Sequence, residues 1–306
     1  MNQPTPISSP NLSKTSTVQA PFWARAIASL PLGVCQRFGA ILGQLVYWAS
    51  PSYRDKFETQ WNAGASWANS NLNIQWTAMQ KSAAIAHAGK MTLEALWVWC
   101  RPPQEVMKAV ICTDEAVLEN AEAAGKGEMY LTPHLGTFEV AARFCATRKA
   151  MTALFKPSKQ ASVNRLFEVA RNLPGLTMAP ADGSGVRKML KALKAGQSIG
   201  LLPDQVPPLN QGVWTEFFGK PAYSMPLPEK LHAATGASVV MTFCERLGNG
   251  KGWHMHYKTF EGVPTPQAVN DAMQLWIAQH PDQYLWGYNR YKQPTLASNV
   301  ISKDRE

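Results

Sequence analysis

The sequence predicts an α/β fold, an open and largely parallel sheet flanked by helices, with an N-terminal helical membrane-associating region. From about residue 127, short apolar runs alternate with longer amphipathic ones, as strands and helices do around a parallel sheet. The run at 198–202 (SIGLL) is apolar at nearly every position, as a strand covered on both faces requires. Before this region, residues 22–50 are mostly apolar and carry aromatic residues near both ends, which is typical of membrane-surface segments.

The 306 residues are predicted to divide into four parts. Residues 1–20 are rich in Pro, Ser, Thr, Asn and Gln, which predicts a disordered tail, and they lack the apolar core of a signal peptide. A helical region is expected at 21–110, and Pro102-Pro103 closes it. The α/β domain then spans 111–296, and a polar tail spans 297–306.

The segment 22–50 is predicted to lie on a membrane surface rather than to cross the bilayer. Arg25 and Arg37 interrupt it, so no uncharged run reaches the roughly 18 residues of a spanning helix. Trp23, Tyr47 and Trp48 would lie at the boundary with the lipid headgroups. The alternative is an ordinary packed pair of helices at the start of the domain.

The elements of the α/β domain are predicted from their hydrophobic periods. Strands are expected at 128–132, 151–155, 176–179, 198–202, 238–244 and 253–260, and helices at 137–146, 162–172, 185–193, 228–235 and 267–279. Ligands of such sheets bind beyond the carboxyl ends of the strands. Two polar segments lie at such ends: His134 follows one strand, and Asp204-Gln205 follows another.

The charge of the chain, +9 from 30 basic and 21 acidic residues, favours an anionic partner such as a phospholipid, nucleic acid or acidic protein. Eleven Trp residues favour a membrane interface. Nucleic acid is disfavoured, because no helix-turn-helix, zinc-finger or RNA-binding aromatic signature is found. The basic run at 187–194 is interpreted as a solvated helix face, with docking of an acidic carrier protein as the alternative.

The sequence predicts no metal site. The five cysteines are odd in number and form no C-x-x-C pair, which indicates reduced thiols in a cytosolic setting and no structural zinc. His254 and His256 would project from one face of a strand. Because no nearby Cys, Asp or third His completes a set of ligands, we interpret them as a solvated strand face.

The segment 132–139 (TPHLGTFE) places a histidine and a glutamate five residues apart. In one continuous helix, His134 and Glu139 would diverge by about 140° and could not meet. They can meet if His134 lies in a turn, with Gly136 as the bend, and Glu139 in the first turn of the following helix. Glu139 would then hold one ring nitrogen while the other takes a proton, like the second half of a serine-protease triad. The spacing alone favours the alternative, a packed histidine and a helix-capping glutamate.

The string TPHLGTFEV resembles the His-x4-Asp/Glu motif of the glycerolipid acyltransferase superfamily, and it is closer to the bacterial lauroyl/myristoyl acyltransferases of lipid A biosynthesis, whose motif uses Glu. Further similar segments follow in the family's order and extend the resemblance over about 127–292. They are LFKP at 154–157, Arg171, GLLPDQ at 200–205, VWTEFFGKPA at 213–222, TGASVV at 235–240 and QYLWGYNRYK at 283–292.

This resemblance implies a reaction. An acyl-carrier-protein thioester would donate a fatty acyl chain to a hydroxyl of a lipid A precursor, with His134 as general base, Glu139 as its partner and no cofactor. It also implies the acyl carrier protein and an anionic lipid as partners, at the cytoplasmic face of the inner membrane. The acceptor stays open, with a lysophospholipid or an aminolipid as alternatives. A catalytically silent lipid- or nucleic-acid-binding protein is the competing class.

The same resemblance indicates substrate-binding residues. Lys156 and Arg171 are candidates for binding anionic phosphates, and the planar fork of an arginine suits bidentate contact. Asp204 would orient Arg171 or the acceptor beside Gln205, or would only bond to the local backbone at the start of a loop. The backbone N–H groups of 135–137 are candidates for stabilising a negative tetrahedral intermediate.

Overall fold

The structure, a computed structural model, describes residues 20–155 and 173–296. Most of the predicted tail at 1–20, the polar tail at 297–306 and the whole of the helix predicted at 162–172 lie outside the described residues. Lys156 and Arg171 also lie outside them.

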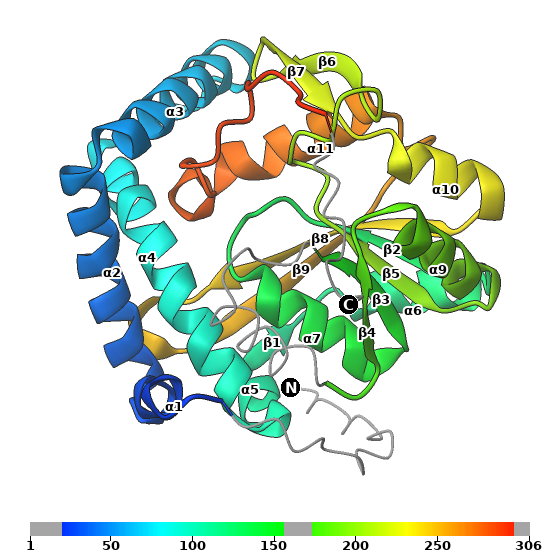
Figure 1. Cartoon of the computed structure of the whole chain (residues 1–306), viewed down its shortest axis with the longest axis horizontal. Helices are drawn as coiled ribbons and strands as arrows, with labels where there is room; N and C mark the ends of the chain where they lie inside the picture. Colours follow the sequence, from blue (N-terminus) through cyan, green and yellow to red (C-terminus); the bar gives the residue numbers. More distant parts are fainter. Residues whose placement is uncertain (1–19, 156–172, 297–306) are drawn as a thin grey trace, which may run out of the picture.

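A seven-stranded sheet with the order β1-β9-β8-β2-β5-β3-β4 forms the centre of the molecule (Figure 1). Its strands are β1 (Val110–Cys112), β2 (Glu128–Leu131), β3 (Met151–Phe155), β4 (Leu176–Pro180), β5 (Ser198–Leu201), β8 (Ser238–Arg246) and β9 (Trp253–Thr259). Five neighbouring strands, from β8 to β4, are parallel, which confirms the predicted α/β sheet. Strand β9 runs antiparallel to β8, because the connection through η1 (Gly248–Gly250) is too short for a parallel crossover.

Helices cover both faces of this sheet because its strands are apolar on both faces. On one face, α9 (Gly183–Lys194), α10 (Leu227–Thr235) and α11 (Pro266–Gln279) share a core with Met129 and Leu131 of β2. On the other face, α6 (Glu115–Ala123) and α7 (Phe138–Arg148) share a core with Tyr130. The alternation along β2 thus sends successive side chains into two different cores.

A small antiparallel hairpin, β6 (Val213–Phe217) and β7 (Lys220–Ser224), lies outside the main sheet. Its two-residue turn uses Phe218 and Gly219, both with positive φ, as a tight hairpin turn requires. Asn270 of α11 donates hydrogen bonds to Thr215 and Ser224 and so ties the hairpin to that helix.

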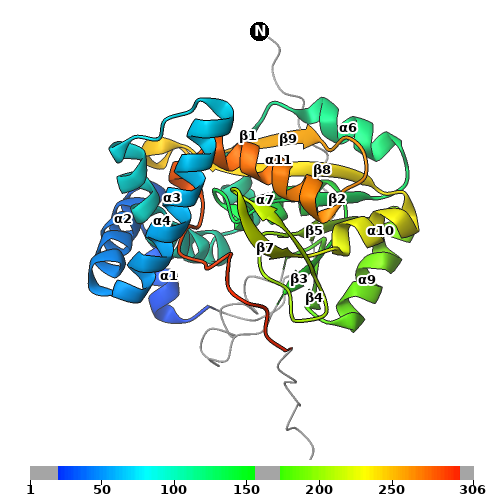
Figure 2. The same ribbon diagram turned by 90° about the horizontal axis from the view of Figure 1, so that it is seen from above.

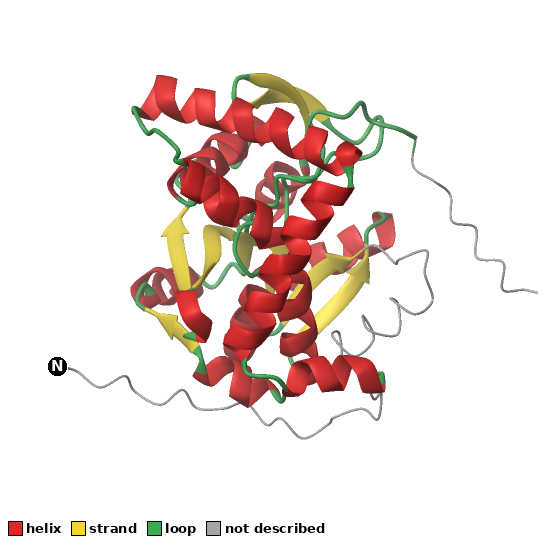
Figure 3. Ribbon diagram, turned by 90° about the vertical axis from the view of Figure 1, so that its left-hand side faces the viewer, coloured by secondary structure: helices red, strands yellow, loops and turns green. Residues whose placement is uncertain are grey.

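The N-terminal region is helical, as predicted, and forms a layer along one side of the sheet (Figures 2 and 3). Its helices are α1 (Phe22–Ser29), α2 (Leu32–Ala49), α3 (Pro51–Leu72), α4 (Ala78–Cys100) and α5 (Pro103–Lys108). Phe57 and Trp61 of α3 belong to the same core as residues of the sheet, so the layer and the sheet bury apolar surface together. The boundary at 110/111 stays a prediction.

Helices α2 and α4 pack in close contact through glycines. A Cβ on Gly89 would lie 2.1 Å from the carbonyl oxygen of Gly39 and 2.4 Å from the amide nitrogen of Gly43. The opposite side of α2 exposes large apolar residues, among them Ile41 and Leu45 at 56% each. None of the described helices is by itself long and apolar enough to cross a bilayer, although α1 and α2 pass that test together across a bend of 113°. Membrane association therefore stays a prediction.

A buried polar cluster connects the helical layer to the sheet. The carboxylate of Glu94 in α4 accepts a hydrogen bond of 2.7 Å from Nε of Arg246 in β8, and both side chains are buried. Glu94 also accepts from Gln36 at 2.8 Å and from the hydroxyl of Thr137 at 3.2 Å. Because Thr137 immediately precedes α7, this cluster fixes α4 against the start of that helix.

Candidate active site

The loop that joins β2 to α7 is held by hydrogen bonds to two other parts of the chain. The N–H of Thr137 donates to the carbonyl of Cys244 in β8 at 2.8 Å, and the N–H of Gly136 donates to the carbonyl of Gln283 at 2.8 Å. The carbonyl of His134 accepts from the N–H of Leu285 at 3.0 Å. The loop is therefore fixed relative to the sheet although it has no regular structure of its own.

Gly136 is required at the tightest point of this loop. Its φ of 63° lies in the left-handed region, and a Cβ there would be 2.0 Å from the carbonyl oxygen of Cys244. The predicted turn with a glycine bend is thus present, and close approach to β8 adds a second reason for glycine.

The N–H groups expected to stabilise a tetrahedral intermediate have other partners. Besides those of Gly136 and Thr137, the N–H of Leu135 donates to the carbonyl of Pro133 at 2.7 Å. The prediction that the N–H groups of 135–137 stabilise an oxyanion was wrong, because all three already donate to carbonyl groups of the chain.

The ring of His134 is held by Asp204. The His134 Nδ1 lies 2.7 Å from Oδ1 of Asp204, and the backbone N–H of His134 donates to Oδ2 at 2.8 Å. Asp204 is 2% exposed. Burial alone would raise the pKa of its carboxyl, but the charge of His134 and its two hydrogen bonds outweigh burial and lower that pKa. An ionised carboxylate only accepts hydrogen bonds, so the ring nitrogen that faces it, Nδ1, carries a proton.

Strand register explains how these two residues meet. Strands β2 and β5 are parallel neighbours in which Leu131 stands beside Leu201. His134 and Asp204 each lie three residues beyond that pair, so they reach the same point of the sheet edge. The predicted position of Asp204 at a strand end is correct. Its predicted contact with Arg171 lies outside the described residues, and both of its carboxylate oxygens contact His134.

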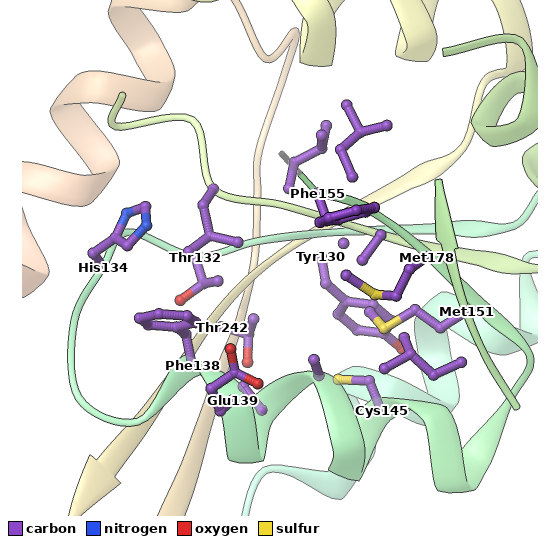
Figure 4. Close-up of a pocket in the computed structure, with 18 of the residues that line it drawn as sticks. Tyr130, Thr132, His134, Phe138, Glu139, Cys145, Met151, Phe155, Met178 and Thr242 are labelled. Atoms are coloured by element: carbon purple, nitrogen blue, oxygen red, sulfur yellow. The ribbon is translucent and has the colours of Figure 1, made fainter. Parts of the chain in front are cut away.

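Glu139 does not hold the ring of His134, which corrects the expected pairing. Glu139 lies in the first turn of α7, as predicted, but its carboxylate accepts a hydrogen bond of 2.8 Å from Nε1 of Trp99 in α4. The ring of Phe138 packs edge-on against His134 at 5.0 Å between centroids. In the close-up the ring of Phe138 lies between His134 and Glu139 (Figure 4).

The side chain of Gln205 contacts the ring nitrogen of His134 that does not face Asp204. Its Nε2 lies 3.1 Å from Nε2 of His134, and an amide N–H donates to an unprotonated ring nitrogen. Gln205 is exposed, whereas its neighbour Asp204 is buried. The unprotonated nitrogen thus faces a position that a substrate group can occupy, where it can accept a proton.

A cavity of about 390 Å³ begins at His134 and extends between α7 and the sheet (Figure 4). At its polar end lie Thr132, His134, Glu139 and Gln205. The remainder is mostly apolar, and its lining includes Tyr130, Leu154, Met151, Leu176 and Met178. A cavity of this kind can bury an aliphatic chain while it presents one end of the chain to the imidazole.

Two buried arginines, which the motif spacing did not identify, lie near the carboxylates of Asp204 and Glu139. The charge of Arg290 contributes to lowering the pKa of Asp204, and its guanidinium donates to the carbonyl of Tyr223 at 2.7 Å. Arg143 lies one helical turn after Glu139 in α7, and the charge of Glu139 opposes the lowering of the Arg143 pKa by burial. The one sequence signal for Arg290 was its place in the segment 283–292.

The chain matches the family model of the bacterial lipid A biosynthesis acyltransferases over residues 22–293. It is similar to a lipid A biosynthesis acyltransferase of Haemophilus influenzae, with 23% identity over 55% of each chain. A phosphatidylinositol mannoside acyltransferase of Mycobacterium tuberculosis is 27% identical over 54% of each chain. A lipid A biosynthesis palmitoleoyltransferase of Escherichia coli is 24% identical over 74% of this chain and 78% of its own. The matched part of the first two relatives is about half of their length.

We predict that Gly136→Ala lowers the free energy of unfolding by about 2 kcal/mol or more, from left-handed strain and from overlap with the backbone of β8. Gly248→Ala is the matched control, because Gly248 is exposed and a Cβ there meets nothing within 4 Å. It should change that free energy by less than about 0.5 kcal/mol. Denaturant unfolding of both variants measures the difference. Equal free energies of unfolding would contradict the claim that close packing of Gly136 against β8 fixes the loop.

Proposed function

Because the chain belongs to the bacterial lipid A biosynthesis acyltransferase family, we propose that it transfers a fatty acyl chain from an acyl-carrier-protein thioester to a hydroxyl of a lipid A precursor. The observation that carries the proposal is the apolar cavity with the unprotonated ring nitrogen of His134 at its polar end. The acyl donor itself supplies the group that is transferred, so the proposed reaction needs no cofactor.

In the proposed mechanism, His134 is the general base. Its Nε2 takes the proton of the acceptor hydroxyl while the hydroxyl oxygen attacks the thioester carbonyl carbon. The tetrahedral intermediate then collapses, the C–S bond breaks, and the imidazolium returns the proton to the leaving thiolate. Asp204 holds Nδ1–H and stabilises the positive charge on the ring, as the carboxylate of a serine-protease triad does.

We assign separate roles to the other polar groups. The acceptor hydroxyl would displace the amide of Gln205 from Nε2 of His134, which leaves that amide beside the reacting carbonyl as a hydrogen-bond donor. Glu139 lines the same cavity and is held by Trp99, so it would orient a substrate rather than the imidazole. Lys156 and Arg171 are proposed to bind acceptor phosphates, a role that follows from the family resemblance.

The proposed partners are inferred from a basic surface on α9 and an apolar surface on α2. Helix α9 exposes Arg187, Lys188, Lys191 and Lys194, and this basic face is suited to an acidic carrier protein that delivers the acyl donor. The exposed apolar side of α2 would rest on the cytoplasmic face of the inner membrane, where an anionic lipid acceptor is located. Acylation of a different lipid is the second candidate, since the Mycobacterium tuberculosis relative is named for a phosphatidylinositol mannoside.

A double-mutant cycle tests which carboxylate works with His134. His134→Ala and Asp204→Asn should each lower kcat at least about 100-fold, and the double variant should be little worse than either, because residues that act as a unit are not additive. Glu139→Gln should combine multiplicatively with Asp204→Asn, since the two carboxylates act separately. Steady-state kinetics with an acyl-carrier-protein donor provides the data. Full turnover in His134→Ala would reject the mechanism. If instead a third double variant, His134→Ala with Glu139→Gln, is non-additive while His134→Ala with Asp204→Asn is additive, Glu139 is the partner that the motif spacing suggests.

The apolar part of the cavity is predicted to select acyl chain length. Met178 lines it from β4, the last strand in the order of the described sheet. Met178→Trp should shift the preferred donor to shorter chains, and each excluded methylene should cost about 0.8 kcal/mol, or about fourfold in kcat/KM. The matched control is Met79→Trp, because Met79 is 79% exposed at the start of α4. An unchanged length profile in Met178→Trp would place the acyl chain elsewhere.

Membrane binding is predicted to depend on the exposed side of α2. Ile41→Glu with Leu45→Glu should weaken co-sedimentation with anionic phospholipid vesicles by at least about tenfold, since burying each side chain is worth about 1.5–3 kcal/mol. The control, Val263→Glu with Leu275→Glu, makes the same charge change at exposed apolar sites outside α2. If both double variants lose binding equally, net charge rather than α2 governs membrane association.

A further inference from the structure

Three potential metal ligands come together on the hairpin formed by β8 and β9. Glu245 of β8 stands directly opposite His254 of β9, and His256 is two residues further along β9 on the same face. The ligand atoms of these three side chains all lie within 4.8 Å of one another. In the described part of the chain this is the one group of three or more such residues that lie close enough to share an ion.

This group lies on the face of the sheet opposite to the acyl cavity. Thr242 of β8 lines that cavity. Successive residues of a strand point to opposite faces, so Phe243 and Glu245 point away from it. Phe243 belongs to the core that the sheet shares with α11, and its ring contacts His280 at the end of that helix at 4.9 Å between centroids. The three ligands are therefore separate from the proposed reaction.

The surroundings orient both imidazoles. Nε2 of His256 lies 2.9 Å from Oε2 of Glu245, and its ring stacks on Phe243 at 5.4 Å with an interplanar angle of 17°. Nε2 of His254 lies 3.0 Å from the hydroxyl of Thr113. The side chains of His256 and Glu245 are 29% and 26% exposed, so solvent and ions can reach them.

No third ligand for His254 and His256 could be identified from their spacing, because the acidic residue that meets them, Glu245, lies on a different strand. Register supplies it, since the antiparallel pairing places Glu245 across from His254. Two imidazoles and one carboxylate form a ligand set that zinc and similar divalent transition metals prefer.

We propose that Glu245, His254 and His256 bind a divalent transition metal ion of the zinc class, with water or His280 completing the coordination. Ligand atoms about 2.0–2.1 Å from a tetrahedral zinc are about 3.4 Å apart, so these three atoms, now within 4.8 Å of one another, would move closer together on binding. The ion would join β8 to β9 next to Cys244, whose carbonyl accepts the N–H of Thr137. Its role would be to stabilise the strand that holds the catalytic loop.

The test uses the full-length chain without a polyhistidine tag. Titration calorimetry with Zn²⁺ should give one ion per chain, and Co²⁺ should develop the absorption of a tetrahedral site. The melting temperature should rise with Zn²⁺ concentration, because an ion that binds only the folded state stabilises it. His254→Ala and His256→Ala should each weaken Zn²⁺ binding by more than about tenfold, since changes beyond the ligands themselves already cost that much.

Two controls locate the site. His232→Gln should bind Zn²⁺ like the wild type, because His232 lies on α10 and its Nδ1 contacts the carbonyl of Ala237. A variant with Cys100→Ser and Cys112→Ser should also bind normally, which excludes the two partly exposed thiols. Glu245→Gln nearly preserves side-chain shape, so weakened binding in that variant, with unchanged melting in the absence of metal, supports direct ligation. Absence of saturable binding, or undiminished binding in His254→Ala, would overturn the proposal.

Discussion

The arrangement of the candidate site depends on how the loop after β2 is pinned to β8. Gly136 and Thr137 approach the backbone of β8 so closely that Gly136 and Cys244 form an isolated β-bridge. The N–H groups of the loop are used to hold it, and the buried Glu94–Arg246 pair supports the same junction through the hydroxyl of Thr137. A rigid loop lets the site fix an imidazole without a helix or strand beneath it.

The fixed loop brings together two side chains that follow adjacent strands, His134 after β2 and Asp204 after β5. Asp204 is buried and ionised, which is costly unless its charge is compensated. His134 supplies compensation twice, through its backbone N–H and its ring, and the charge of Arg290 adds to it. The same contacts set the tautomer and the orientation of the ring, so the stability of the buried carboxylate and the direction in which Nε2 points depend on one interaction.

Much of the fold could be predicted because periodicity is a local property. The strands at β2, β3 and β5 and the helices α7, α9 and α11 begin and end within a few residues of their predicted bounds. Strand order is not local, so the sequence could not indicate that β2 and β5 are neighbours, and Glu139 was preferred to Asp204 as the partner of His134. The reversed direction of β9 and the addition of Glu245 to two histidines depend on pairing in the same way.

The central claim is that Asp204, and not Glu139, holds the Nδ1–H of His134. Nitrogen-15 NMR of the imidazole measures it directly, because the two ring nitrogens differ strongly in chemical shift when only one is protonated. The His134 signals can be assigned by their loss in His134→Ala. We predict that the neutral imidazole carries its proton on Nδ1 and not on Nε2, with the Nδ1–H resonance displaced in Asp204→Asn and unmoved in Glu139→Gln. A proton on Nε2, or a resonance that responds to Glu139→Gln alone, would contradict the account.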